Sequence, residues 1–489
     1  MTSTPSESSN PGAAIAAAST ERSPLVENVA DDMESTPSVY NEVSSLARLA
    51  APIIFTLFLE FIPGITNLIL VGQMPISNLK LYVDAAAMAS VYTNITSFSV
   101  GFGMATAMDT LCTQAYGAGN VKKFGILLQS ALLGMALTLI PVALVNWFTA
   151  DILHLLGQDP TLADLTGDFV RVLLVGYPAL FCFEVLKKLL QAEGVTTPMA
   201  VMVGVGNVIH VGLGYALTQY STLGYLGAPV ALSLVEWMLV AFMVGYLMWV
   251  NPMHEAWQVE WSWAAAWSHV GQFFQFGVPG MLMMMIEWGA IELLTLVAGL
   301  MPNSLVTIGV NSILANTLNL AYMPYFGLSI AATIRMGNLL GANEPEKAKR
   351  VMFLTLRLCF GCAFASGLTI VLLSPVLPRL LINDTQIVQR GATALFFIVP
   401  LHIVDAMNAA CQGCFRAMGK QDTASGVNAA AFYIVGVPVA VFCGLYLEWS
   451  VEGLWAGFTL GSLTAFVIYQ ILLTKIDWAQ VAQEAIDRE

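Results

Sequence analysis

Residues 51–61 read APIIFTLFLEF, and residues 278–288 read VPGMLMMMIEW. Each stretch has a proline, seven mostly apolar residues and then a glutamate followed by an aromatic residue. The glutamates are Glu60 and Glu287. A charged side chain at the centre of an apolar membrane span costs about 2.5–3.5 kcal/mol on insertion scales, so an acid there indicates a functional site. The recurrence after about 227 residues predicts an internally duplicated membrane protein, a pattern typical of transporters.

The composition agrees with a membrane protein. Of the 489 residues, 57% are hydrophobic and 10% are charged, whereas soluble domains have about 25% charged residues. The mean hydropathy is +0.73. A helix needs about 20 mainly apolar residues to cross the hydrocarbon layer. Twelve stretches meet this requirement, centred near Leu59, Ile95, Leu137, Leu174, Ile209, Leu239, Glu287, Asn316, Ala365, Phe397, Val435 and Leu463.

The duplication extends beyond the two acidic stretches, at an offset near 225 residues. The further matches are Phe102-Gly103 with Phe326-Gly327, residues 117–123 with 341–347, and residues 191–194 with 416–419. The offset gives six spans per repeat. Because six is an even number, both repeats enter the membrane in the same orientation, related by a pseudo-two-fold axis along the membrane normal.

We therefore expect an all-α membrane protein with twelve transmembrane helices in two six-helix lobes. A disordered cytosolic tail comes first, because the N-terminal segment is polar and rich in Ser, Thr and Pro. The predicted N-terminal tail is residues 1–45. The N-lobe with helices 1–6 is residues 46–249, and the C-lobe with helices 7–12 is residues 270–474. A cytosolic linker, residues 250–269, joins the lobes, and a cytosolic tail, residues 475–489, follows them.

The distribution of Lys and Arg sets the predicted orientation, since basic residues concentrate in cytosolic loops. With twelve spans and a cytosolic N-terminus, only Lys80, Arg379 and Arg390 fall outside. The cytosolic set is Arg22, Arg48, Lys122, Lys123, Lys187, Lys188, Arg335, Lys347, Lys349, Arg350, Arg416, Lys420, Lys475 and Arg488. We expect both termini in the cytosol. Residues 21–26, ERSPLV, are similar to an acidic-dileucine sorting signal, which suggests a vacuolar address. The expected location is therefore the vacuolar membrane or the plasma membrane.

Three motifs resemble those of one transporter family. Residues 107–118, AMDTLCTQAYGA, look like the signature after the second helix of multidrug and toxic compound extrusion (MATE) transporters. Residues 279–294 resemble the seventh helix of the eukaryotic branch, and residues 335–343, RMGNLLGAN, the signature after the eighth helix. The resemblance covers the chain from about Leu46 to Leu473.

The resemblance implies a secondary active transporter and not an enzyme. Such proteins export organic cations, drugs or metabolites by antiport, through a central cleft that opens alternately to the two sides. The implied partners are these small molecules and the lipid bilayer, without nucleic acid, and a monomer is expected. No cofactor is implied; the coupling ion is a proton, with sodium the less favoured choice.

The family's acidic positions fall on particular residues of this chain. Glu287 matches the seventh-helix acid, where protons and cations bind, and Glu292 a second acid on that helix. Asp405 matches an acidic position on the tenth helix. Asn316 stands where some animal members have a glutamate, and Asn67 where bacterial members have an aspartate. With Asn316, a third acid of the C-lobe is missing, whereas the missing first-helix aspartate, together with the acids present in the C-lobe, favours coupling by protons.

The chemistry of Glu287 fits this role, because a coupling group must be charged in one state and neutral in another. Burial among apolar side chains disfavours the charged form of a carboxyl group, so a proton and an organic cation would compete for Glu287. Glu292 lies about 140° further around an ideal helix. We expect Glu287 to face the cleft and Glu292 to face the lobe interior.

The remaining candidate residues fall into two sets. The predicted substrate cavity comprises Asn316, Trp288, Tyr322, Tyr433, Asn311 and Glu60. The rings of Trp288, Tyr322, Tyr325 and Phe326 would face an organic cation, Asn316, Asn311 and Tyr433 would form a proton network with Asp405, and the role of Glu60 is open. Asp109 and Arg335 are predicted gate or scaffold residues, with Asp109 paired to Lys122, to Arg335 or to a helix N-terminus. No metal site is predicted.

Two other transport functions remain as alternatives. One is a sodium-coupled exporter of the same fold. The other is a flippase of lipid-linked precursors, whose cleft would carry basic residues for phosphate. The spans contain only Arg171 and Arg357 in the predicted topology, which disfavours the flippase. A membrane enzyme is disfavoured because no nucleophile or metal constellation stands out in the sequence.

Overall fold

The computed structural model describes residues 39–250, 260–382 and 384–488. The chain divides into residues 1–45 and residues 46–489. Of the first part, only residues 39–45, which begin the first described helix, are described. The described ranges contain helices and no strands, which confirms the all-α prediction.

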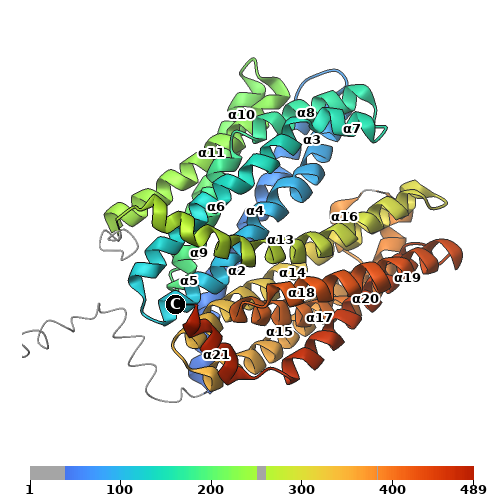
Figure 1. Ribbon diagram of the computed structural model, residues 1–489. Helices are drawn as coiled ribbons and strands as arrows, with labels where there is room; N and C mark the ends of the chain where they lie inside the picture. Colours follow the sequence, from blue (N-terminus) through green and yellow to red (C-terminus); the bar gives the residue numbers. More distant parts are fainter. Residues whose placement is uncertain (1–38, 251–259, 383, 489) are drawn as a thin grey trace, which may run out of the picture. The chain divides into compact units, whose positions relative to one another are not determined.

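Helices from the first repeat are coloured blue to green in Figure 1. We call residues 46–250 the N-terminal half. Its elements are α2 (Val39–Gly72), α3 (Leu79–Thr93), the π-helix η1 (Asn94–Phe98), α4 (Ser99–Ala105), α5 (Ala107–Gly117), α6 (Val121–Trp147), α7 (Thr149–Leu155), α8 (Pro160–Leu173), α9 (Tyr177–Ala192), α10 (Thr197–Gln219), η2 (Gly224–Leu226), α11 (Gly227–Gly245) and η3 (Tyr246–Val250).

The C-terminal half, yellow to red in Figure 1, follows residue 260. Its elements are α13 (Trp263–Gly299), α14 (Ser304–Gly341), α15 (Pro345–Leu373), α16 (Leu377–Leu381), α17 (Thr385–Met418), α18 (Gln421–Asn428), η4 (Ala429–Gly436), α19 (Val437–Val441), η5 (Phe442–Tyr446), α20 (Ser450–Thr474) and α21 (Trp478–Asp487). Side-chain oxygens cap several of these helices; Asp384, for example, accepts from the Gln386 and Ile387 amides at the start of α17.

Ten helices in the described ranges are long and apolar enough to cross a membrane. An eleventh candidate is the pair α8 and α9, which is bent by 50° at a short break. The predicted span near Leu174 coincides with that break, and the one near Ile95 with the consecutive short elements α3, η1, α4 and α5. The structure thus supports ten to eleven of the expected spans by length and composition.

Two predicted boundaries fall inside helices. Helix α2 begins at Val39, within the predicted N-terminal tail, and α13 begins at Trp263, within the predicted linker. The Ser262 hydroxyl accepts a hydrogen bond from the Ala265 amide, which fixes the start of α13 ahead of its apolar residues. Residues 1–38 and 251–259 of the predicted tail and linker lie outside the described residues.

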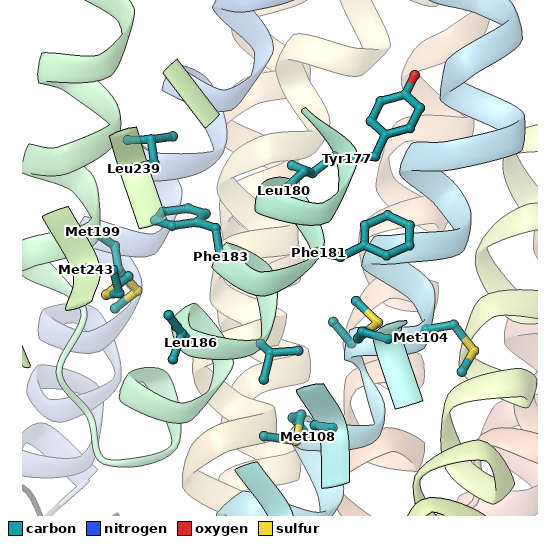
Figure 2. Close-up of a cluster of buried hydrophobic side chains, with 14 of the residues drawn as sticks. Met104, Met108, Tyr177, Leu180, Phe181, Phe183, Leu186, Met199, Leu239 and Met243 are labelled. Carbon is teal, nitrogen blue, oxygen red and sulfur yellow. The ribbon is translucent and has the colours of Figure 1, made fainter. Parts of the chain in front are cut away.

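Buried apolar side chains form separate cores in the two halves. The largest runs from Leu70 to Phe276 and includes the α9 face shown in Figure 2, where Phe181 and Phe183 point to opposite sides of the helix. Two other cores lie among helices of the C-terminal half, around Tyr325 and around Trp455. Each half therefore buries most of its apolar surface against itself.

The first helix of each repeat also reaches into the other half. Ile53 and Leu57 of α2 pack in one cluster with Phe326 of α14. Phe273 and Phe276 of α13 belong to the core of the N-terminal half. The two stretches that reveal the duplication therefore lie on the helices that join the halves.

Glycines allow these crossings, and they do so reciprocally. A Cβ atom on Gly103 would meet the backbone of Met281 on α13, and a Cβ atom on Gly327 would meet the backbone of Ile54 on α2. Gly103 and Gly327 are equivalent in the repeat, and so are the stretches that they contact. Small residues allow helix backbones in membranes to approach closely.

A comparable approach joins α19 and α20. A Cβ atom on Gly457 would collide with the backbone of Ala440. We predict that Gly457→Ala lowers the free energy of unfolding by about 1–3 kcal/mol, the usual cost of overpacking. Thermal unfolding of the detergent-purified protein measures this. Gly361→Ala on α15 is the matched control, because nothing lies within 4 Å of its Cβ position; equal melting temperatures for the two variants would contradict the prediction.

Candidate functional site

Glu287 lies on α13 and is 7% exposed. Its Oε2 accepts a hydrogen bond from the Gln412 amide of α17 at 2.9 Å and a longer one from the Asn428 amide of α18 at 3.5 Å. The Tyr469 hydroxyl donates to the Asn428 carbonyl oxygen at 2.7 Å and so orients that amide. Within the described ranges, no Lys, Arg or His forms an ion pair with Glu287. Its hydrogen-bond partners are therefore neutral amides, and Arg416 is close enough for a charge–charge interaction without forming an ion pair with it.

Asp405 lies on α17 and is partly buried. It accepts a hydrogen bond from the Tyr325 hydroxyl of α14 at 2.8 Å. The Tyr325 ring packs against the His402 ring with centroids 5.2 Å apart, which fixes its position. Asp405 is also close enough to Glu287 for their charges to interact. The structure thus brings together two of the three predicted coupling acids.

Glu292 lies apart from these two acids. It is more exposed than Glu287, and no hydrogen bond or ion pair of its side chain is found among the residues that the structure describes. Glu287 contacts side chains of α17 and α18 in the C-terminal half, and the predicted facing of the two glutamates relative to a cleft stays a prediction. The polar side chains of Gln412 and Asn428 explain the position of Glu287, since a buried carboxyl group needs hydrogen-bond donors.

The three aromatic residues of the predicted cavity differ in their surroundings. The Tyr322 ring stacks on Phe326 at 4.8 Å, and Trp288 packs against the same cluster of α2 and α14. Tyr433 is 41% exposed on η4, and its hydroxyl lies beside Gly289, two residues after Glu287. All three are close to the stretch of α13 that carries the acid.

The predicted proton network of Asp405 with Asn311, Asn316 and Tyr433 is not the arrangement seen. The Asn311 amide donates to Thr295, and its oxygen accepts from the Trp455 indole, both at 3.0 Å. Asn316 donates to the carbonyl of Ser312, one turn earlier on its own helix. Asn311 therefore has a packing role, and the partner of Asp405 is Tyr325.

Asp109 forms a buried ion pair that joins the halves. Its carboxylate lies 2.8 Å from the Lys188 ammonium of α9 and 3.9 Å from the Arg416 guanidinium of α17. The sequence analysis expected Lys122, Arg335 or a helix N-terminus as its partner, and the partners seen are Lys188 and Arg416. Arg335 lies on α14 and is partly buried.

Glu60 also belongs to an ion pair. The Lys187 ammonium lies 2.7 Å from Glu60 of α2 and 2.6 Å from Glu184 on its own helix. Glu60 was predicted to line the substrate cavity, but its charge is already balanced by Lys187. The pair has a counterpart in the other half: with the repeat offset, Glu60 corresponds to Glu287 and Lys187 to Gln412. Equivalent positions thus hold an acid with an ammonium in one half and an acid with an amide in the other.

The buried cations were missed by sequence reasoning. Lys187, Lys188 and Arg416 are 2%, 3% and 2% exposed, so they are not loop residues. The expectation that Arg171 and Arg357 are the only basic residues of the spans is therefore wrong, because Lys187 and Lys188 lie inside α9 and Arg416 inside α17; their place on the cytosolic side stays a prediction. Glu184 stands one helical turn before Lys187 in a strongly apolar stretch, and this spacing was the available signal. The acids and two aromatic rings keep these cations stable when buried.

The two rings are Phe102 of α4 and Phe326 of α14, which are equivalent in the repeat. Lys187 and Lys188 lie 5.2 and 5.5 Å from the Phe102 ring centre. Arg416 lies 5.8 Å from the Phe326 ring centre, and the two rings are 6.3 Å apart. The aromatic faces predicted for an organic cation are therefore partly taken by the protein's own cations.

The C-terminal ends of α9 and α17 are capped from the opposite half. Gln114 of α5 donates to the Ala417 carbonyl at 2.8 Å, and Asn338 of α14 donates to the Ala192 carbonyl at 3.2 Å. The last carbonyls of a helix have no partner within the helix. Because Gln114 and Asn338 are equivalent in the repeat, as are Ala192 and Ala417, these two hydrogen bonds obey the same internal symmetry.

Buried acids with neutral partners, on crossing helices of a duplicated membrane protein, are typical of a membrane transporter. The sequence profile described as MatE matches residues 52–216 and 279–442. The chain is 30% identical over 451 residues to "Multidrug and toxin extrusion protein 2" of Mus musculus, covering 92% of this chain and 77% of that protein. It is 29% identical over 474 residues to "Protein DETOXIFICATION 14" of Arabidopsis thaliana, covering 96% of both.

The fold agrees with these sequence comparisons. The crystal structure of the eukaryotic MATE transporter AtDTX14 superimposes with a TM-score of 0.86 at 27% identity, covering 92% of this chain and 99% of that one. The protein belongs to the MATE family of membrane transporters and is not an enzyme.

The Asp109 ion pair provides a test of the contact between the halves. Asp109→Asn leaves Lys188 and Arg416 buried without a counter-charge, so we predict a loss of about 3–5 kcal/mol in the free energy of unfolding. Asp168→Asn is the control, because its pair with Arg171 is partly exposed and contributes about 0–1 kcal/mol. Thermal unfolding in detergent compares the two variants; similar melting temperatures would contradict a structural role for Asp109.

Proposed function

We propose that this protein is a proton-coupled antiporter that exports organic cations, drugs or metabolites by alternating access through a central cleft. Glu287, with Asp405 and Glu292, carries the coupling charge. Trp288, Tyr322 and Tyr433 contribute to the substrate site, and Asp109 and Arg335 act as gate or scaffold residues. The multidrug and toxin extrusion named in the mouse relative supports export of foreign compounds.

One observation carries the proposal: Glu287 is buried and has amide partners only in the described part of the chain. An acid held by a fixed cation stays charged, since losing that charge leaves the cation unpaired. An acid held by amides can bind a proton or a substrate cation and release either. Glu60, the equivalent acid, has Lys187 beside it and lacks this freedom.

The proposed architecture has twelve helices in two six-helix lobes, with both termini in the cytosol of a vacuolar or plasma-membrane protein and a monomer as the working unit. The separate cores of the two halves and their reciprocal contacts support the two-lobe arrangement. The C-terminal ends of α5, α9, α14 and α17 meet where Gln114 and Asn338 cap the opposite half. We propose that this contact closes the cytosolic side.

The flippase is less favoured, although the contact between the two halves contains more buried basic residues than the sequence suggested. Lys187 is held by Glu60 and Glu184, and Lys188 by Asp109. The cations that a lipid phosphate would need are therefore already paired with acids of the protein. A sodium-coupled exporter is less favoured because a metal ion needs several oxygen ligands, and no group of three or more His, Cys, Asp or Glu suited to a metal ion is found in the residues searched.

Transport in proteoliposomes tests the coupling. With a fluorescent organic cation and an imposed pH gradient, we predict that Glu287→Gln reduces gradient-driven transport at least tenfold, or about 1.4 kcal/mol. The amide keeps the size of the side chain and removes its charge change. Sodium gradients at constant pH are expected to drive no transport in the wild type.

Glu346→Gln is the matched control, because Glu346 is exposed near the start of α15. It should transport as the wild type does. Gradient-driven transport by Glu287→Gln at the wild-type rate would refute the assignment of the coupling group, and transport driven by sodium would refute the choice of ion.

A further inference from the structure

The N-terminal half contains a cluster of charged side chains for which the proposed mechanism has no use. Glu60 of α2 and Glu184 of α9 share the Lys187 ammonium, at 2.7 and 2.6 Å. Glu236 of α11 is close enough to Glu184, Glu60 and Lys187 for their charges to interact. Three carboxyl groups therefore surround one ammonium group.

The neighbouring helices do not supply enough positive charge to balance the cluster. Lys188 of α9 is paired with Asp109 of α5, which also lies 3.9 Å from Arg416. On α10, His210 contacts the Asn67 side chain. Glu60, Glu184 and Glu236 have only Lys187 among them, because Lys188 is taken by Asp109, and Arg416 interacts with the charges of both Asp109 and Glu287. At least one negative charge is left over, and an uncompensated buried charge is strongly destabilising.

Two oxygens of the cluster have no partner. Oε2 of Glu184 and Oε2 of Glu236 are buried and accept no hydrogen bond from any residue that the structure describes. Glu184 itself is only 5% exposed. A carboxylate oxygen in this position is costly, whereas a protonated carboxyl group can donate a hydrogen bond and has no charge to desolvate.

We propose that Glu60, Glu184 and Glu236 form a second proton-binding site, in the N-terminal half, in which one proton on Glu236, which forms no ion pair in the described part of the chain, supplies the missing positive charge. The inference rests on the proposed function in one respect: it assigns a further proton to the same transport cycle. The site differs from Glu287, which is in the other half and has amide partners.

A proton suits this site better than a metal cation. The cavity beside Glu184 has a volume of about 10 Å³ and is lined by Phe98, Gly101, Phe102, Leu180 and Phe181 besides the glutamate. That volume is at the lower limit for one water molecule. A metal cation would need several oxygen ligands and room for them, and the space beside Glu184 offers neither, since the other lining residues are apolar. A proton needs one oxygen and no added space.

The site is connected to the contact between the halves. Lys187 holds Glu60 and Glu184, and the next residue, Lys188, holds Asp109 against Arg416 of α17. Loss of the proton adds a negative charge within reach of both lysines. The charge of the cluster therefore acts on the same ion pairs that join α5, α9 and α17.

Infrared difference spectroscopy on the full-length, detergent-purified protein tests the site, because a protonated carboxyl group has a C=O stretch distinct from that of a carboxylate. We expect wild type near neutral pH to show a carboxylic-acid band that Glu236→Gln or Glu184→Gln removes and that Glu346→Gln leaves in place. Proton uptake measured by titration should fall by about one per molecule in the same variants.

Glu60→Gln provides a second variant at a partly exposed acid, and size-exclusion profiles show whether each variant is folded. The proposal would be overturned if the carboxylic-acid band stayed unchanged in every folded variant of the cluster. It would also be overturned if that band changed with sodium concentration at constant pH. The result does not depend on transport: if Glu287→Gln still transports normally, the proposed coupling group is wrong, while the band lost in Glu236→Gln still identifies the second site.

Discussion

Every buried charge in this protein has to be balanced inside a medium that does not solvate it, and the two halves do this in different ways. In the N-terminal half, Glu60 has Lys187 beside it, a cation that belongs to the protein. At the equivalent place in the C-terminal half, Gln412 offers Glu287 an amide. Glu60 therefore has a built-in counter-charge, whereas the charge of Glu287 depends on what it binds. The proposed transport cycle depends on this difference.

The fixed cations also organise the boundary between the halves. Lys188 and Arg416 reach Asp109 from different halves, and the rings of Phe102 and Phe326 lie under the same cations. Charge and packing therefore coincide at one layer. When one member of a buried ion pair withdraws, the other is left as an uncompensated buried charge, which is strongly destabilising. Separation of the halves at this layer would therefore need other groups to pair with Asp109, Lys188 and Arg416.

Sequence reasoning found the class of fold and the main acid for physical reasons that lie in local patterns. Apolar stretches of sufficient length, their duplication and an acid within them are visible without any tertiary information, so Glu287 was found from the pattern. Asp405 came from the family resemblance, and the two acids are close together. The partners of these acids were missed. Gln412, Asn428 and Tyr325 are far along the chain from the acids that they hold, and amides or tyrosines on apolar helices carry no signal of their own. The burial of Lys187, Lys188 and Arg416 was missed because a positive charge near a helix end looks like a loop residue until its counter-charge is known.

The reciprocal contacts of Gln114 with Ala417 and of Asn338 with Ala192 have an evolutionary consequence. When the same patch meets itself across a two-fold axis, the interface is that of a symmetric homodimer. A single-repeat ancestor could therefore have associated through this patch, with each copy capping the other's helix ends. Fusion of the copies into one chain freed their sequences to diverge, since a substitution now alters one of the two contacts and not both. The lysine at position 187 and the glutamine at position 412 are the kind of asymmetry that only a fused gene can acquire.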